Sequence, residues 1–267
     1  IIDKGLNLGV KTFYPNVSHI GYKGYNNTDN YLFYTNPTEF EVINNLIPET
    51  LAIIGEGYKN INNRYFSNQK LLVTGGFRFK KLFDFKRISN NISKQKKILI
   101  LLPISTKESI EILELIINSI NITNNYTIYN VKPHPALNFN AVLYYFNKKW
   151  PSYFQIIDGD LIKIAIQSNL VIGSGTTACF EVLALGVPVI IIGSQSNLTN
   201  NPIPRSINSK IWKLVYKTND LTNYIDFYLS LNTIQINELI EIGFDIKKQF
   251  FTQITKEKVN HLLGLSN

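Results

Sequence analysis

The sequence predicts an α/β fold built on a doubly wound parallel sheet, and two observations carry this prediction. Short, continuous apolar runs recur from residue 97 onward, at 97–103, 169–173 and 187–193 among others, as is typical of strands covered on both faces. Segments with helical spacing separate these runs, which favours parallel strands joined by right-handed crossovers. Ligands of such sheets bind beyond the carboxyl ends of the strands.

Each element follows from a local signal. The segment 105–120 is predicted to be a helix because Ser105 or Thr106 can cap it and apolar residues recur at helical spacing after it. Asp160 is predicted to cap the helix at 160–168 rather than to bind a metal. Gly186 is predicted to end the helix that precedes strand 187–193. The remaining expected strands are 126–131, 153–157 and 211–216, and the remaining helices are 136–148, 160–168, 176–186, 219–230 and 234–250.

The first part of the chain has a different character, with many Asn, Tyr and Gly residues. It shows two short strand candidates, 50–55 and 70–75, and one helix candidate, 36–46. We therefore expect a partial N-terminal α/β domain over residues 1–93 and a Rossmann-like domain over residues 94–267. The polar, basic segment 89–97 is the expected linker between them.

Composition restricts the class of protein. The net charge is +8, but the lysines are spread along the chain and no nucleic-acid-binding motif accompanies them, so we expect no nucleic-acid partner. Weak attraction to an anionic membrane surface is compatible with this charge. A single cysteine excludes a disulfide framework and fits a reducing compartment. Because the chain has no methionine and opens on Ile1-Ile2, we expect it to be a piece of a longer polypeptide.

The segment GSGTTACFE (173–181) is the strongest candidate site. A strand ends at Gly173, and Gly175 and the hydroxyls of Ser174, Thr176 and Thr177 precede a helix, which is a ready anion site. The Walker loop and the GxGxxG fingerprint are both absent. The alternative is an ordinary strand-to-helix turn. Glu181 lies one turn further, where it either accepts hydrogen bonds from ribose hydroxyls or is solvated.

A histidine between two prolines follows another strand, in the order Lys132, Pro133, His134, Pro135. The prolines stiffen this turn, so His134 is held either for packing or to donate a hydrogen bond to a phosphate. Lys132 lies on the same side of the extended chain and adds a positive charge. We expect this segment and GSGTT to share one edge of the sheet, which favours ligand contact.

Two further segments are candidates for the same edge. Gly193 ends strand 187–193, and Ser194 follows it. Arg78, which follows strand 70–75, either reaches the cleft or is structural. No zinc site is expected from one cysteine and scattered histidines.

KPHP followed by GSGTT…E…ALGVPVI resembles the C-terminal half of GT-B-fold glycosyltransferases of bacterial surface-carbohydrate biosynthesis (capsule, O-antigen and lipopolysaccharide). The likeness is strongest to the sialyl-, polysialyl- and Kdo-transferase groups, which use CMP-activated sugars. It covers about residues 36–193, because the NPTEFEVINNLIP…IIGEG…VTGGFRF pattern is similar to the interdomain region of such proteins.

The resemblance implies a GT-B-like fold and an inverting, metal-independent glycosyl transfer without a cofactor. The donor would be a CMP-linked nonulosonic acid or Kdo, and the acceptor a glycan or glycolipid met in the cytoplasm or at the inner face of the membrane. His134 and Pro135 match the HP motif, and Ser174, Thr176 and Thr177 match the hydroxyl motif, both of which hold the nucleotide phosphate. Glu56 is the one candidate in this chain for the catalytic base, which otherwise lies outside it.

Three alternatives remain open at this point. The same half-fold serves UDP-sugar 2-epimerases and also serves enzymes that transfer glycerol phosphate from CDP-glycerol. The third alternative is a non-catalytic subunit that only binds a nucleotide.

Overall fold

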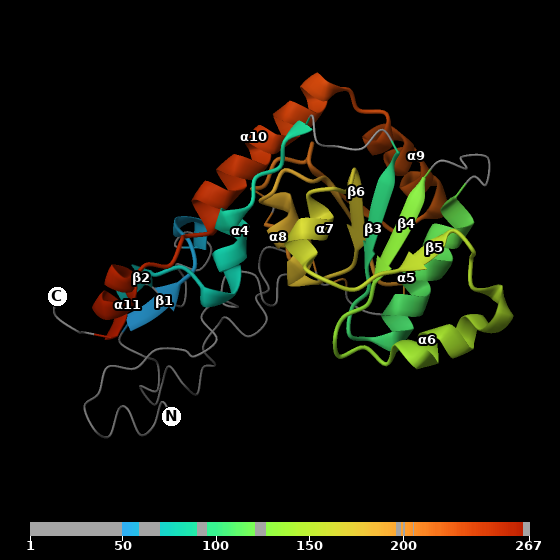
Figure 1. The fold of residues 1–267 in the computed structure, drawn as a ribbon, viewed down its shortest axis with the longest axis horizontal. Coiled ribbons are helices and arrows are strands. Elements are labelled where there is room, and N and C mark those ends of the chain that lie inside the picture. Colours follow the sequence, from blue (N-terminus) through green and yellow to red (C-terminus); the bar gives the residue numbers. More distant parts are fainter. Residues whose placement is uncertain are drawn as a thin grey trace.

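A computed structural model describes residues 50–58, 70–89, 95–120, 127–195, 199, 201–204 and 206–263. Its centre is a six-stranded sheet in which every pair of neighbouring strands is parallel. The strands lie in the order β5 (Phe154–Ile156), β4 (Ile128–Lys132), β3 (Lys97–Leu101), β6 (Leu170–Gly173), β7 (Val189–Ile192) and β8 (Trp212–Val215). The predicted doubly wound parallel sheet is therefore confirmed, and Figure 1 shows it at the centre of the molecule.

Helices lie between successive strands, as the alternating pattern predicts. Helix α5 (Thr106–Ser119) packs against α6 (Phe139–Phe146) and α9 (Thr218–Leu229), whereas α7 (Leu161–Ala165) packs against α8 (Thr177–Leu183). Side chains of β3, β6 and β7 are buried along almost their whole length, which is why their sequences are continuous apolar runs rather than alternating ones.

Two of the predicted helix caps are confirmed. The Ser105 hydroxyl accepts a hydrogen bond from the Glu108 amide, and the Asp160 carboxylate accepts hydrogen bonds from the amides of Ile162 and Lys163. One helix starts later than predicted: α6 begins at Phe139 instead of residue 136, because the prolines continue into a turn and Asn138 caps the helix. A short 3-10 helix, η5 (Asn147–Lys149), follows α6.

A second, two-stranded parallel sheet contains β1 (Thr50–Ile53) and β2 (Lys70–Val73). Both strands were predicted, with slightly longer bounds. Two short 3-10 helices, η2 (Glu56–Tyr58) and η3 (Phe77–Phe79), follow these strands, and α4 (Lys80–Asp84) leads toward the large sheet. The predicted helix at 36–46 lies outside the described residues, and the division at residue 93 stays a prediction.

The C-terminal helices return to the small sheet. Helix α10 (Thr233–Phe250) runs along the molecule to α11 (Lys256–Leu263), which lies beside β1 and β2 (Figure 1). Phe250, at the end of α10, packs edge-on against both Tyr58 and Phe180. One hydrophobic core therefore joins residues next to the small sheet with those of the large one. Within the described ranges no helix is long and apolar enough to cross a membrane.

Candidate functional site

The strand order defines a switch point between β3 and β6. From β3 the chain moves outward to β4 and β5, and from β6 it moves in the other direction to β7 and β8. The loops that leave β3 and β6 therefore diverge at the carboxyl edge of the sheet, and open α/β sheets bind ligands at such a point. Because all six strands are parallel, the segments after β4, β6 and β7 share this edge, as the sequence predicts.

The KPHP segment is fixed to the β3 exit through its backbone. The Leu102 amide donates to the Lys132 carbonyl (3.1 Å), and the His134 amide donates to the Leu102 carbonyl (3.1 Å). The His134 side chain is exposed, and its Nδ1 accepts a hydrogen bond from the Ala136 amide at 3.1 Å. A neutral imidazole that accepts at Nδ1 carries its proton on Nε2. His134 therefore presents a hydrogen-bond donor at the edge of the sheet.

The GSGTT segment follows β6, which pairs with β3 on the side opposite β4. Gly173 pairs with Leu101 in the ladder, and a Cβ at position 173 would lie 2.8 Å from Cys179 Sγ, so this position requires glycine. The Thr176 hydroxyl caps α8 by accepting from the Ala178 amide at 3.4 Å. Ser174 is 7% exposed, and its hydroxyl has no hydrogen-bond partner among the described residues.

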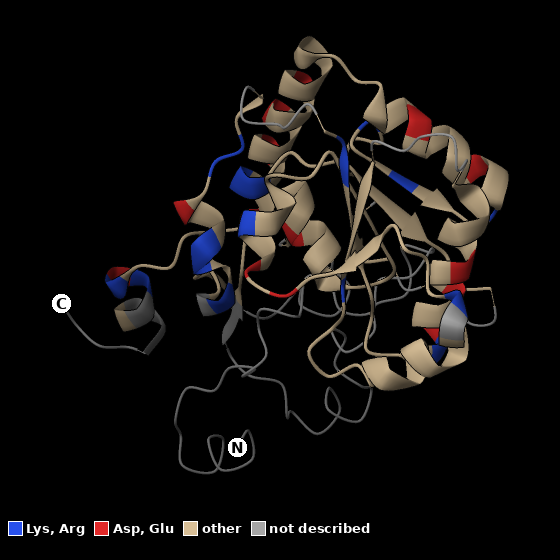
Figure 2. Cartoon of the chain, turned by 45° about the vertical axis from the view of Figure 1, so that its right-hand side comes forward, with Lys and Arg blue, Asp and Glu red and all other residues tan. Residues whose placement is uncertain are grey.

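Arg78 reaches α8 from η3, across 103 residues of sequence. Its Nη2 donates to the Thr177 hydroxyl at 2.8 Å and also to the Glu181 carboxylate. Figure 2 shows basic positions, in blue, along the segment that carries α4, which continues from η3. Arg78 therefore belongs to the candidate site rather than to a separate surface. Its side chain is 42% exposed, and both of these hydrogen bonds come from a single guanidinium nitrogen, Nη2.

Glu181 is a buried carboxylate with a 9% exposed side chain. Burial raises its pKa above the usual value, and the charge of Arg78 opposes this rise. The possibility that Glu181 is solvated is therefore wrong. Its contact with a ribose stays a prediction, because the described partner of its carboxylate is Arg78.

Lys132 has a carboxylate partner at the outer side of the edge. Its Nζ lies 3.5 Å from Asp158 Oδ1, and the pKa of Asp158 is lowered first by the Gly159 amide and then by Lys132. Two residues further, Asp160 caps α7 and pairs with Lys81, which lowers the pKa of Asp160. Both carboxylates of this Asp-Gly-Asp sequence thus have cationic partners.

Among the described residues, no group of three or more His, Cys, Asp and Glu side chains is placed to hold a metal ion.

Gly193 and Ser194 lie next to β8 at the same edge. The Gly193 amide donates to the Val215 carbonyl at 2.8 Å, and the Ser194 amide donates to the Thr199 hydroxyl at 3.1 Å. The sequence alone does not point to Tyr216, which follows β8 and contacts Gly193. It also does not point to the loop 102–105, because only the strand order places the β3 exit between the KPHP and GSGTT segments.

Glu56 lies on the small sheet instead of the large one. It is exposed in η2, after β1, and its neighbours Gly55 and Gly57 pack on Phe250 at the end of α10. The strands therefore bring His134, Ser174 and Gly193 to one edge, and Arg78 joins them from η3. Glu56 is positioned by a different element, and its role as a base stays a prediction.

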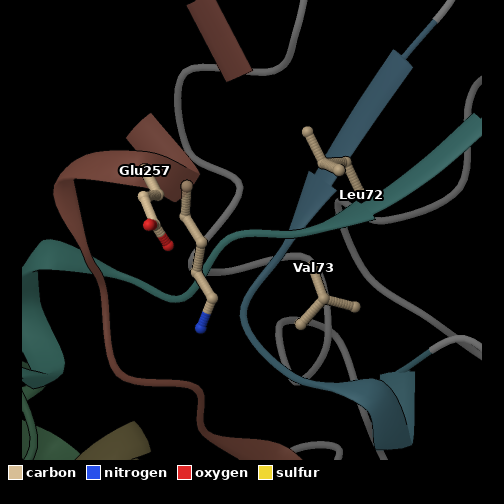
Figure 3. Close-up of a pocket in the computed structure, with 4 residues that line it drawn as sticks. Leu72, Val73 and Glu257 are labelled. Carbon is tan, nitrogen blue, oxygen red and sulfur yellow. The ribbon is translucent and has the colours of Figure 1, made fainter. Parts of the chain in front are cut away.

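A separate groove lies between β2 and α11 (Figure 3). It is lined by Leu72, Val73, Glu257 and Lys258. Lys258 donates through Nζ to the Gln253 carbonyl at 3.0 Å, and the other polar group, Glu257, is acidic. This groove is thus poorly suited to a phosphate, in contrast to the edge of the large sheet.

Solved structures with the same architecture give an independent view of the fold. A UDP-GlcNAc 2-epimerase from Methanocaldococcus jannaschii, in complex with UDP-GlcNAc and UDP, matches 99% of this chain and 72% of its own chain, with a TM-score of 0.64 and 16% identity. The UDP complex of MnaA from S. aureus matches 99% of this chain and 73% of its own, with a TM-score of 0.62 and 13% identity. The fold is GT-B-like.

A glycosyltransferase has this fold as well. The glycotransferase of kitacinnamycin matches 82% of this chain and 56% of its own, with a TM-score of 0.53 and 11% identity. No protein-family model matches the sequence, and no curated protein matches it. The GT-B-like fold that the sequence predicts is therefore confirmed, and the structural neighbours include both glycosyltransferases and UDP-GlcNAc 2-epimerases.

Proposed function

We propose that this chain binds a nucleotide-activated sugar at the carboxyl edge of the large sheet and serves a glycosyltransferase. One observation carries the proposal: the switch point lies between two segments that both present hydrogen-bond donors. Nε2 of His134 is a donor on the β4 side, and the Ser174 hydroxyl is a buried, unpartnered donor on the β6 side. Neighbouring strands are about 4.8 Å apart, so a phosphate above β3 would lie within reach of both.

Several groups support binding of the phosphate. Gly175 lets the ligand approach the backbone closely, and the hydroxyls of Thr176 and Thr177 add polar contacts beside it. Arg78 hydrogen-bonds to Thr177 and contributes a positive charge that suits phosphate oxygens. Pro133 and Pro135 hold His134 in place before the ligand arrives, which limits the entropy lost on binding.

The proposed reaction is an inverting displacement at the anomeric carbon. A base removes the proton of the acceptor hydroxyl, the acceptor oxygen bonds to the anomeric carbon, and the bond from that carbon to the phosphate oxygen breaks. Its electron pair stays on the departing phosphate, where His134 and Ser174 stabilise the growing negative charge. Glu56, or a residue outside this chain, supplies the base. No metal ion is needed for these steps in the proposal.

The proposed donor is CMP-linked, as a nonulosonic acid or Kdo, and the proposed acceptor is a bacterial surface glycan or glycolipid. The resemblance of the KPHP and GSGTT motifs supports the CMP-linked donor. The net charge of +8 supports peripheral contact with an anionic membrane surface that carries such an acceptor.

A second candidate is a UDP-sugar 2-epimerase, and one observation favours it. The M. jannaschii and S. aureus proteins match 99% of this chain with TM-scores above 0.6. Incubation of this chain with UDP-GlcNAc separates the two candidates: an epimerase interconverts the sugar at C2 without an acceptor, and a transferase does not.

Calorimetric titration with CMP, UDP and CDP-glycerol tests the proposal. Tighter binding of CMP supports the CMP-sugar transferase, tighter binding of UDP supports the epimerase, and tighter binding of CDP-glycerol supports glycerol-phosphate transfer. Binding of none of the three contradicts the proposal as a whole.

For turnover measured as CMP released from CMP-N-acetylneuraminic acid, His134→Ala is expected to lower kcat about 100-fold or more, by analogy with the loss of an oxyanion donor. An unchanged kcat would overturn the role of His134.

A further inference from the structure

The exits of β7 and β8 form a third part of the ligand edge. Gly193 follows β7, Tyr216 follows β8, and the ladder between these strands continues through the hydrogen bond from the Gly193 amide to the Val215 carbonyl. Since β7 and β8 lie beyond β6 in the sheet, Tyr216 and His134 lie on opposite sides of Ser174. No step in the phosphate chemistry described above uses Tyr216.

The Tyr216 side chain is held in place by polar contacts. Its hydroxyl donates to the Thr199 hydroxyl at 3.1 Å, and this same Thr199 oxygen accepts from the Ser194 amide at 3.1 Å. Thr199 is buried, which makes it a firm anchor. The Tyr216 carbonyl accepts from Gln195 Nε2 at 2.8 Å. Both ends of the residue are therefore fixed.

The ring itself lies against Gly193. A Cβ at position 193 would lie only 2.1 Å from Tyr216 Cε1 and 2.5 Å from Cζ, so the ring occupies the space that any other residue at 193 would fill. Tyr216 is nevertheless 39% exposed. An aromatic ring that is already held in place loses little freedom when a ligand contacts its exposed part.

We propose that Tyr216, seated on Gly193, contacts the sugar half of the nucleotide sugar, so that the exits of β7 and β8 form the saccharide subsite. This inference rests on the proposed function. With the phosphate above β3, two strand spacings, about 10 Å, separate it from the exit of β7, where the Tyr216 ring lies against Gly193. This distance is the reach of a monosaccharide bonded to that phosphate. Ser194 and Gln195 hydrogen-bond to Thr199 and to the Tyr216 carbonyl, and ligand sites commonly combine aromatic faces with a few such polar groups.

Matched pairs of ligands test this inference. The probes are CMP against CMP-N-acetylneuraminic acid, and UDP against UDP-N-acetylglucosamine, titrated calorimetrically into the wild-type chain and its variants. Tyr216→Leu removes the ring, Tyr216→Phe keeps the ring without the hydroxyl, and Gly193→Ala displaces the ring from its seat. Phe227→Leu is the control, because Phe227 on α9 is also a partly exposed aromatic residue, 47% exposed against 39% for Tyr216. Thermal unfolding of each variant establishes that it is folded.

If Tyr216 contacts the sugar, the variants should lose affinity only for the ligands that carry a sugar. Tyr216→Leu and Gly193→Ala are expected to bind the preferred nucleotide sugar about tenfold more weakly, the scale of one lost aromatic contact, and to bind the free nucleotide as the wild type does. Tyr216→Phe is expected to stay within about threefold of the wild type, since only one hydrogen bond is lost. Two variants, Gly193→Ala and Tyr216→Leu, are measured because they test the same contact. If one of them misfolds, the affinities of the other still decide the result.

Two results would overturn the inference. If the Tyr216 variants lose equal affinity for the nucleotide and for the nucleotide sugar, Tyr216 either contacts the nucleoside or has only a structural role. Unchanged affinities for both ligands in Tyr216→Leu would show that the ring contacts neither. Failure of the wild-type chain to bind any free nucleotide is a separate result: it contradicts the proposed function, and the saccharide subsite falls with it.

Discussion

Arg78 donates from a single nitrogen, Nη2, to both Thr177 and Glu181, and so ties the segment after β2 to the first turns of α8. This contact crosses about a hundred residues of sequence. It also places a cation beside a buried carboxylate at the proposed phosphate site. The free energy of unfolding should therefore depend on the charges of Arg78 and Glu181. This dependence can be measured without knowing the ligand.

Arg78→Ala is expected to reduce the free energy of unfolding by about 1–3 kcal/mol at pH 8, because it leaves the buried Glu181 carboxylate without its partner. The deficit is expected to shrink as the pH falls. Burial raises the pKa of Glu181 in the folded state above its unfolded value, so protonation of Glu181 at lower pH removes the need for a cation.

Urea unfolding between pH 5 and pH 8 measures this effect. Glu181→Gln serves as the matched control, since it keeps the shape and removes the charge. In the Glu181→Gln background, Arg78→Ala should cost less than it does alone. A deficit that is independent of pH, and identical in both backgrounds, would show that the pair contributes nothing electrostatic.

Ser174→Ala is expected to separate stability from binding. The Ser174 hydroxyl is buried without a described partner, so its removal relieves an unsatisfied polar group and leaves the free energy of unfolding unchanged or slightly higher. If the hydroxyl binds phosphate, the affinity for the preferred nucleotide should fall about tenfold. Thermal unfolding and calorimetry on the same sample give both quantities. Destabilisation with unchanged nucleotide affinity would assign Ser174 a structural role instead.

His134 is expected to carry its proton on Nε2 when neutral, because Nδ1 accepts from the Ala136 amide. Nitrogen-15 NMR of the imidazole at pH 8 distinguishes this tautomer from the other. The same geometry predicts that His134→Gln, whose amide nitrogen reaches the Nε2 position, retains more nucleotide affinity than His134→Asn, whose amide nitrogen reaches the Nδ1 position. Equal losses in the two variants would show that the Nε2 donor is not the group that matters.

Gly243→Ala is expected to destabilise the protein, although alanine normally stabilises a helix interior by about 1 kcal/mol relative to glycine. Gly243 lies in the middle of α10, and a Cβ there would lie 2.2 Å from the Gly186 amide nitrogen. Because the contacted atoms belong to the backbone, α10 would have to move away from the turn after α8. Chemical denaturation measures the sign, and a stabilised variant would mean that α10 does not pack so closely.

Local signals in the sequence predicted much of the large sheet and its helices. Strands such as 97–101 and 170–173 are continuous apolar runs because both faces are covered, and Ser105 and Asp160 act as caps through bonds to amides two or three residues away. Both kinds of signal depend on neighbouring residues, so they can be read without the tertiary structure.

The long-range relationships could not be predicted in this way. Nothing near Arg78 in the sequence specifies Glu181 as its partner, and the same holds for the buried Arg87, which donates to the carbonyls of Ser168 and Gly186. Similarly, the position of the β3 exit between two candidate segments follows from strand order alone. The sequence identified the chemical groups at the edge, whereas their arrangement depends on the sheet.

The central claim is that a nucleotide binds between the exits of β4 and β6, and NMR mapping on the wild-type chain tests it most directly. Backbone amide resonances are followed during titration with CMP and, separately, UDP. The account predicts that the largest shifts occur at His134, Gly175 and Thr177 for at least one of the two nucleotides. Shifts concentrated at Leu72, Val73 and Lys258, in the groove between β2 and α11, or no shifts with either nucleotide, would contradict it.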